Sequence, residues 1–146
     1  DAFHEMQSNP NVLRYADGKV KSKSEHLEEL KELIRKYNSV KRDFLIYAIE
    51  NKQSKLFLGT VALVKNNLDA EIGYRFLEKY WNNGYGYEVC KGLTVFCKKL
   101  KLQKIVGFVI LKNIASKRIL EKLDFRIIDT FTNSEGEKEY KYELEL

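Results

Sequence analysis

Two glycines, Gly84 and Gly86, lie where a strand pattern changes into a helix pattern. Residues 70–76 alternate, with apolar side chains on one face and Glu71 and Gly73 on the other. From Val89 onward, apolar residues recur at helical spacing. The N-terminus of a helix carries free backbone N–H groups and a positive dipole end, and glycine there lets a ligand approach the main chain. This stretch therefore predicts a phosphate-binding turn.

Other interpretations of the turn are weaker. Asn83-Gly84 is also a strong hairpin signal, but a hairpin needs alternating residues on both sides and a helical pattern follows Gly86. The phosphate loop GxxxxGK[ST] is absent, and the dinucleotide pattern GxGxxG would need glycine where Val89 stands.

Three segments resemble the GNAT acetyltransferases. Residues 81–88, WNNGYGYE, are similar to the family's pyrophosphate loop [Q/R]xxGx[G/A], with Trp81 in the Gln/Arg position. The EIGY at residues 71–74 resembles the ribosomal-protein N-terminal acetyltransferase branch. So does the NxxSxxxxEKxGF pattern at residues 113–125, where Asp124 replaces the family glycine. The resemblance covers residues 9–132, and the strand that the family places before them is not evident.

The resemblance implies a site for acetyl-CoA, with no metal. Its pantetheine arm would lie along the strand at Ile72, Gly73 and Tyr74. Its pyrophosphate would meet the turn formed by Asn82, Asn83, Gly84, Tyr85, Gly86 and Tyr87. Asn113 and Ser116 would be further contacts.

Two residues are candidates for the chemistry of transfer. Glu71 is the candidate base, because it shares a strand face with Gly73; the alternative is a surface carboxylate in an ion pair. The resemblance implies that Ser116 protonates or hydrogen-bonds the departing thiolate. Asn113 has an alternative role as an ordinary helix N-cap.

The implied activity is N-acetyl transfer from acetyl-CoA to a primary amine by direct attack in a ternary complex, since no activated nucleophile is evident. The branch resemblance favours a protein N-terminus as acceptor, and small-molecule amines stay open. The alternative is a non-catalytic acyl-CoA-binding or regulatory domain of the same fold.

Length and composition set further bounds. With 146 residues, the chain is expected to form one GNAT-like domain over residues 1–146, as a monomer or homodimer. No apolar run could span a bilayer, and the net charge of +5 comes from scattered residues, so nucleic-acid binding is not expected. Cys90 and Cys97 lie about 10 Å apart on one helix, too far for a disulfide, which suits the cytoplasm.

The predicted fold is α/β (α+β), a mixed and mostly antiparallel sheet with one central parallel pair, flanked by helices. The predicted strands are residues 43–50, 55–65, 70–77, 105–111, 126–132 and 139–146. The predicted helices are one from the Ser22–Glu25 capping box to Tyr37, then residues 86–101 and 113–123. Polar connections are expected at residues 17–22 and 66–69. The residues expected to face the core from the helices are Leu27, Leu30, Leu33, Ile34, Tyr37, Val89, Leu93, Phe96, Leu100, Ala115, Ile119, Leu120 and Leu123.

Overall fold

The computed structural model describes residues 1–16, 19–39, 43–66 and 69–146. Its strands are β1 (Phe44–Glu50), β2 (Phe57–Asn66), β3 (Asp69–Phe76), β4 (Lys104–Ile110), β5 (Arg126–Thr132) and β6 (Lys138–Glu145). Its helices are α1 (Ala2–Gln7), α2 (Pro10–Leu13), α3 (Lys23–Tyr37), the 3-10 turn η1 (Glu78–Tyr80), α4 (Tyr85–Lys99) and α5 (Ile114–Lys122). Parts of the connections predicted at residues 17–22 and 66–69 lie outside the described residues.

The strands form one six-stranded mixed sheet in the order β1-β2-β3-β4-β6-β5. β3 and β4 are parallel, whereas β4–β6 and β5–β6 are antiparallel. The predicted fold class, with its single central parallel pair and flanking helices, is confirmed. A strand, helix and parallel strand in succession require the crossover connection that α4 provides.

The chain folds as two compact units, each built from two segments. One contains residues 1–63 and 74–83, and the other contains residues 64–73 and 84–146. The single-domain organisation stays a prediction.

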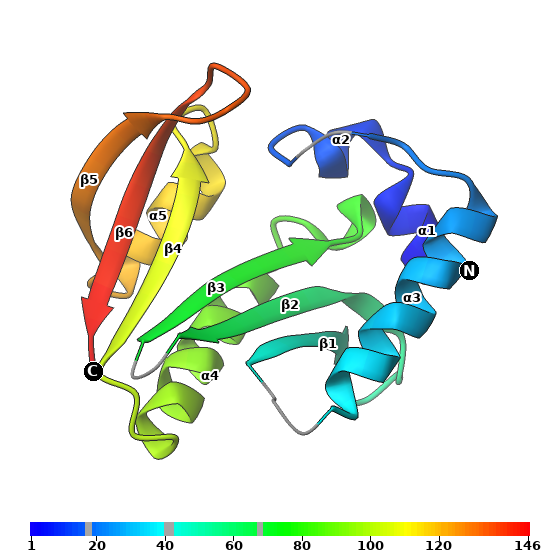
Figure 1. The fold of residues 1–146 in the computed structure, drawn as a ribbon, viewed down its shortest axis with the longest axis horizontal. Coiled ribbons are helices and arrows are strands. Elements are labelled where there is room, and N and C mark those ends of the chain that lie inside the picture. Colours follow the sequence, from blue (N-terminus) through cyan, green and yellow to red (C-terminus); the bar gives the residue numbers. More distant parts are fainter. Residues whose placement is uncertain (17–18, 40–42, 67–68) are drawn as a thin grey trace. The chain divides into compact units, whose positions relative to one another are not determined.

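In the first unit, α3 lies beside α1 and β1 (Figure 1). The predicted capping box is confirmed, because Ser22 accepts from the backbone N–H of Glu25 while the Glu25 carboxylate accepts from the backbone N–H of Ser22. Glu78 ties α2 to η1, since its two carboxylate oxygens accept from the side-chain amides of Asn9 and Asn11 at 2.7 and 2.8 Å.

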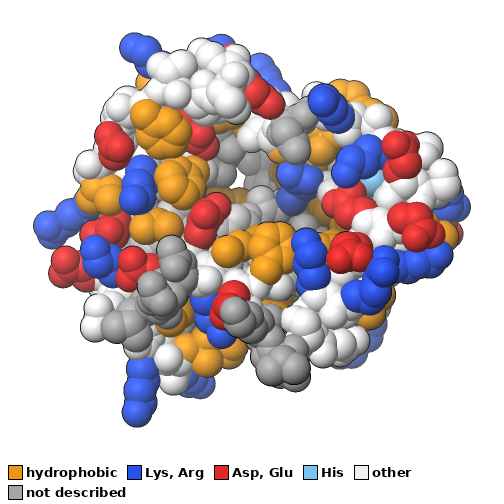
Figure 2. Space-filling model, viewed as in Figure 1, with side chains coloured by type: hydrophobic (Ala, Val, Ile, Leu, Met, Phe, Trp, Pro, Cys, Tyr) orange, Lys and Arg blue, Asp and Glu red, His pale blue; other side chains and the backbone are white. Residues whose placement is uncertain are grey.

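In the second unit, α5 covers one face of the strands β4, β6 and β5 (Figure 1). Tyr142 of β6 is fully buried and donates from its hydroxyl to Glu121 of α5 at 2.9 Å. On the other face, Phe108 and Phe131 form an edge-to-face pair with ring centroids 6.0 Å apart. Hydrophobic side chains gather over these strands on the surface (Figure 2). One face is therefore core and the other is partly open to solvent.

The three predicted helices form as α3, α4 and α5, but they bury different side chains, and the sequence did not predict α1 and α2. In α3, Leu27 and Ile34 are 52% and 55% exposed, whereas the buried residue is His26. Sequence periodicity marks an amphipathic helix, but neighbouring elements decide which stripe becomes buried. For α3, that stripe includes the polar side chain that contacts α1.

The other two helices show the same effect. In α4 the buried stripe runs through Cys90, Leu93 and Cys97, while Phe96 and Leu100 are substantially exposed. Both cysteines are free and fully buried. In α5, Leu120 is buried as predicted but Ala115 is exposed.

Candidate functional site

The predicted phosphate-binding turn contains a position where the backbone conformation requires glycine. Gly84 is the N-cap of α4 and has a left-handed backbone, with φ +81°. An added Cβ would meet no described atom within 4 Å, so the requirement comes from the backbone conformation rather than from crowding. Among the described residues, no side chain caps this end of α4. The helix therefore starts with its first-turn N–H groups directed toward a ligand or water. The hairpin alternative is wrong, since a helix follows.

Trp81 anchors the segment that enters the turn. Its indole N–H donates to the carbonyl oxygen of Phe76 at 3.0 Å, and its own carbonyl accepts from the Asn83 side chain at 2.9 Å. Asn82, between them, also has a left-handed backbone, with φ +59°. Two left-handed residues so close together make a compact, preformed bend, because local hydrogen bonds hold it without a ligand.

The strand beside the turn leaves its parallel neighbour early. The described pairs of β3 with β4 are Asp69–Lys104, Ala70–Ile105 and Glu71–Val106, and the described ladder does not continue through Ile72 and Gly73. An added Cβ on Gly73 would meet no described atom within 4 Å. The backbone at Gly73 can therefore pair with an extended ligand, because the described ladder with β4 ends before it.

Glu71, the predicted base, lies on the same sheet face as its register partner Val106. A Cβ built on Gly107 would point toward Leu120 of α5. Because side chains alternate along a strand, Val106 and Phe108 lie on the face away from that helix, and so does Glu71, the register partner of Val106. The pKa of Glu71 is raised, first by partial desolvation and then by the negative charge of Glu139. A carboxylate with a raised pKa is better suited to accept a proton near neutral pH.

Asn113 and Ser116 meet at the start of α5. The Asn113 side-chain oxygen accepts from the Ser116 backbone N–H at 3.2 Å, which confirms the alternative role of Asn113 as an N-cap. The Ser116 side chain is half-buried. A capping role does not exclude ligand contact, because the remaining polar atoms at a helix start still point outward.

The structure adds two charged neighbours that sequence reasoning missed. The Lys122 Nζ lies over the Tyr87 ring, 4.6 Å from its centroid, and thus beside the first turn of α4. Glu139 acts electrostatically on Glu71, although 68 positions separate them in the sequence. Neither had a sequence signal, because each pairing depends on how α5 or β6 packs.

No cluster of three or more His, Cys, Asp or Glu side chains could hold a metal ion within the ranges that the structure describes. None of the described helices combines the length and hydrophobicity needed to cross a membrane.

Comparison with known proteins decides the family. The acetyltransferase (GNAT) domain family matches residues 1–126. The chain belongs to the GNAT acetyltransferase family. The predicted family is thus confirmed, and the ribosomal-protein branch stays a resemblance. This GNAT chain is 29% identical over 132 residues to the uncharacterized N-acetyltransferase YoaA of Bacillus subtilis, covering 86% of this chain and 73% of YoaA.

Solved GNAT structures share the fold of this chain. A GNAT-family acetyltransferase from Bacillus anthracis superposes with a TM-score of 0.85 at 23% identity, covering 99% of this chain and 87% of that one. The spermidine N-acetyltransferase of Vibrio cholerae, solved in complex with CoA and spermine, gives a TM-score of 0.79 at 19% identity, covering 97% and 86%. At these identities the likeness concerns the fold.

Proposed function

We propose that this GNAT acetyltransferase uses acetyl-CoA as donor and a primary amine as acceptor, and that the amine attacks directly in a ternary complex. The observation that carries the proposal is the left-handed Gly84 at the uncapped start of α4. The ladder between β3 and β4 that ends at Glu71 supports it. The family membership supports acetyl transfer to an amine, and the Vibrio cholerae relative was solved with CoA.

The residues of this chain suit the parts of acetyl-CoA. The amides at Asn83–Tyr87 would hold the pyrophosphate, because a helix N-terminus favours negative charge. The backbone of Ile72, Gly73 and Tyr74 would pair with the amides of the pantetheine arm. Asn113 and Ser116 would contact the arm from α5.

Acetyl-CoA supplies a thioester carbonyl, and the products are an amide and a free thiol. The amine must be neutral to attack, so Glu71 accepts the proton that the amine loses, directly or through water. Ser116 donates a hydrogen bond to the sulfur as the carbon–sulfur bond breaks. The chain needs no covalent acyl-enzyme, because positioning two substrates already supplies much of the rate acceleration.

A charge placed in the turn tests the donor site. Gly86→Asp adds a carboxylate to the first turn of α4, where it is compatible with the helix dipole but would repel a pyrophosphate. Like charges about 4 Å apart near a protein surface repel by about 4 kcal/mol, so affinity for acetyl-CoA should fall at least a hundredfold, roughly. Gly92→Asp is the matched control, because Gly92 lies on the same helix with open space around it.

Two assays give the readouts. Calorimetry measures the binding of acetyl-CoA. Turnover is followed as the release of free thiol in the presence of spermidine or of a peptide with a free N-terminus. Micromolar binding in wild type and in Gly92→Asp, lost in Gly86→Asp, supports the donor site. Binding without thiol release for any amine would favour a non-catalytic acyl-CoA-binding domain. The absence of binding in folded wild-type protein would refute the proposal.

The setting of the enzyme is also a proposal. Cys90 and Cys97 are both buried and both free, which suits a reducing compartment such as the cytoplasm. The acceptor is either a protein N-terminus or a small-molecule amine, and a screen of both classes under the thiol-release assay distinguishes them. A monomer or homodimer remains the expected assembly.

A further inference from the structure

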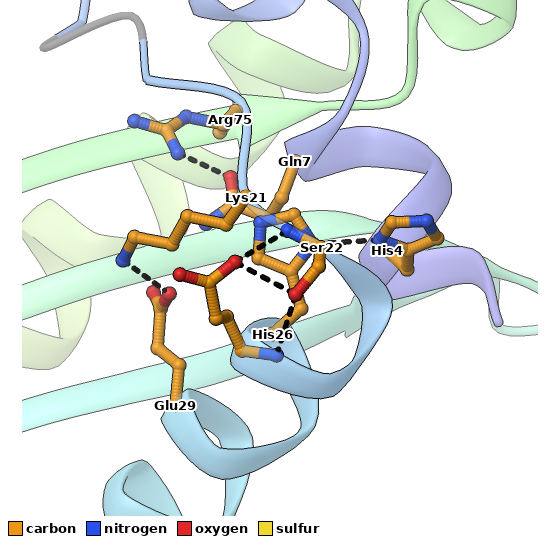
Figure 3. A network of polar contacts seen from close by, with 8 residues as sticks. His4, Gln7, Lys21, Ser22, His26, Glu29 and Arg75 are labelled. Atoms are coloured by element: carbon orange, nitrogen blue, oxygen red, sulfur yellow. Dashed lines mark hydrogen bonds and ion pairs between the residues drawn. The ribbon is translucent and has the colours of Figure 1, made fainter.

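Two histidines from different helices face each other in the first unit. The Nδ1 atoms of His4 on α1 and His26 on α3 are 2.7 Å apart, and their ring centroids are 5.0 Å apart (Figure 3). His26 is only 3% exposed, and Phe3 packs edge-on against its ring. The Ser8 hydroxyl lies 3.0 Å from the same His4 Nδ1. These contacts join α1 to α3.

Two Nδ1 atoms at hydrogen-bond distance must share one proton, because one ring has to donate and the other has to accept. A first added proton can go to the Nε2 of the donor ring, which leaves the shared proton in place and gives a charge-assisted bond. A second added proton must go to the accepting Nδ1. Both nitrogens would then carry hydrogen and both rings would carry charge, so the bond between His4 and His26 must break.

The surroundings oppose that second charge. The pKa of His26 is lowered, first by burial and then by the positive charge of His4. The carboxylates of Glu29 and Glu25 act in the opposite direction, but each is already engaged. Glu29 pairs with Lys21 at 2.9 Å, and Glu25 accepts from Ser22 in the capping box.

The other charged groups near the pair are also in contacts. On α1, Glu5 pairs with Lys79 of η1 at 2.9 Å, and just before α1, Asp1 pairs with Lys23 of α3 at 2.6 Å. From β3, the Arg75 guanidinium donates to the side-chain oxygen of Gln7 (Figure 3). α1 thus connects three places, namely α3 through the histidines, β3 through Arg75 and η1 through Lys79.

We propose that His4 and His26 form a pH-sensitive clasp, which holds α1 on α3 at neutral pH and releases it when both imidazoles become protonated. Release would also loosen the contacts that α1 makes with Arg75 and Lys79. These residues flank the end of β3, so the clasp regulates the order of that segment. The clasp itself does not depend on acetyl-CoA and stands apart from the proposed function.

The direction of the effect follows from linkage. The pKa of His26 in the folded protein lies below its ordinary value of 6.5. Between the lowered pKa and 6.5, the unfolded or released segment binds more protons than the docked one. The stabilisation by the clasp is therefore complete above pH 6.5, declines as pH falls through that window, and levels off below the lowered pKa.

Hydrogen exchange in the intact chain, without ligand, tests the clasp. The reporters are the backbone amides of Glu5 and Ser8, which bond to the carbonyls of Asp1 and His4 at 2.9 Å. After correction for intrinsic exchange, their protection should be constant above pH 6.5 and should then fall by up to about tenfold per pH unit, the limit for uptake of one proton. The Lys117 amide of α5 is the internal control and should not change, which excludes global unfolding.

Two variants separate the histidine pair from the rest of α1. His4→Gln keeps a side chain able to hydrogen-bond with His26 but cannot become charged, so the pH dependence should weaken, and only the part caused by burial of His26 should remain. Ser8→Ala keeps both imidazoles and should retain it. Protection independent of pH in wild type, or unchanged pH dependence in His4→Gln, would overturn the proposal. A His26 imidazole that titrates at or above its ordinary 6.5 by NMR in wild type would overturn it as well, whatever the variants do.

Discussion

Gly59 on β2 is the position where one added methyl group should damage the fold most clearly. A Cβ built there would lie 2.1 Å from the carbonyl oxygen of Arg75 and 2.8 Å from the Cα of Phe76. Both atoms belong to the backbone of β3, so no side-chain rotation can relieve the contact. Beside it, the Leu77 N–H donates to the carbonyl oxygen of Leu58 at 2.9 Å.

The cost of Gly59→Ala follows from this geometry. A carbon and an oxygen atom normally stay at least about 3 Å apart, so β2 and β3 must separate locally by about 1 Å or bend. Overpacking in a close-packed interior costs about 1–3 kcal/mol, and backbone on the opposite side places this variant near 3 kcal/mol or above. For a chain of this size, that loss lowers Tm by about 6–12 °C.

Gly73→Ala is the matched control, because it is the same substitution on a strand of the same sheet. An added Cβ at Gly73 meets no described atom within 4 Å, and its φ is not among the positive ones. Ala should therefore be neutral or more stable by about 0.5 kcal/mol. Urea unfolding followed by circular dichroism measures both variants. Equal stability of Gly59→Ala and wild type, or equal losses in the two variants, would refute the reasoning.

Two further predictions concern ionisable groups. Glu71→Gln should lower kcat by about 10²–10⁴ with acetyl-CoA affinity unchanged, and a wild-type kcat in this variant would contradict the role of Glu71 as base. Glu139→Gln should move the acidic limb of the pH–rate profile to lower pH, because Glu139 raises the pKa of Glu71. Burial raises the pKa of Cys90 to about 12 and of Cys97 to about 11. Neither thiol should therefore react with iodoacetamide at about pH 8 until urea unfolds the protein. Rapid alkylation of the native protein would contradict their burial.

Much of the local structure could be predicted from the sequence. The capping box at Ser22 and Glu25 forms as expected, and α4 begins at the glycine turn. Asp124, which stands where the family pattern has glycine, takes the left-handed conformation that glycine favours, with φ +65°. Turn chemistry and capping depend on residues close together in the chain, so a single sequence contains the information they need.

Burial was less predictable. Leu27 and Ile34 looked like core residues of α3, yet His26 is the side chain that α1 covers. The sequence pointed to Gly73 as the strand glycine beside a ligand, whereas Gly59 is the glycine that another backbone approaches closely. In both cases the decisive neighbour comes from a distant part of the chain.

The sequence by itself determined the GNAT resemblance, the glycine turn before α4 and the strand residues around Glu71, because these are patterns of adjacent residues. Only the tertiary structure decided that Glu139 lies near enough to raise the pKa of Glu71, that Lys122 stacks on Tyr87, and that His4 meets His26 across 22 positions. The physical reason is that charge interactions and close packing act through space. Their strength depends on distances that the fold sets and that no local pattern specifies.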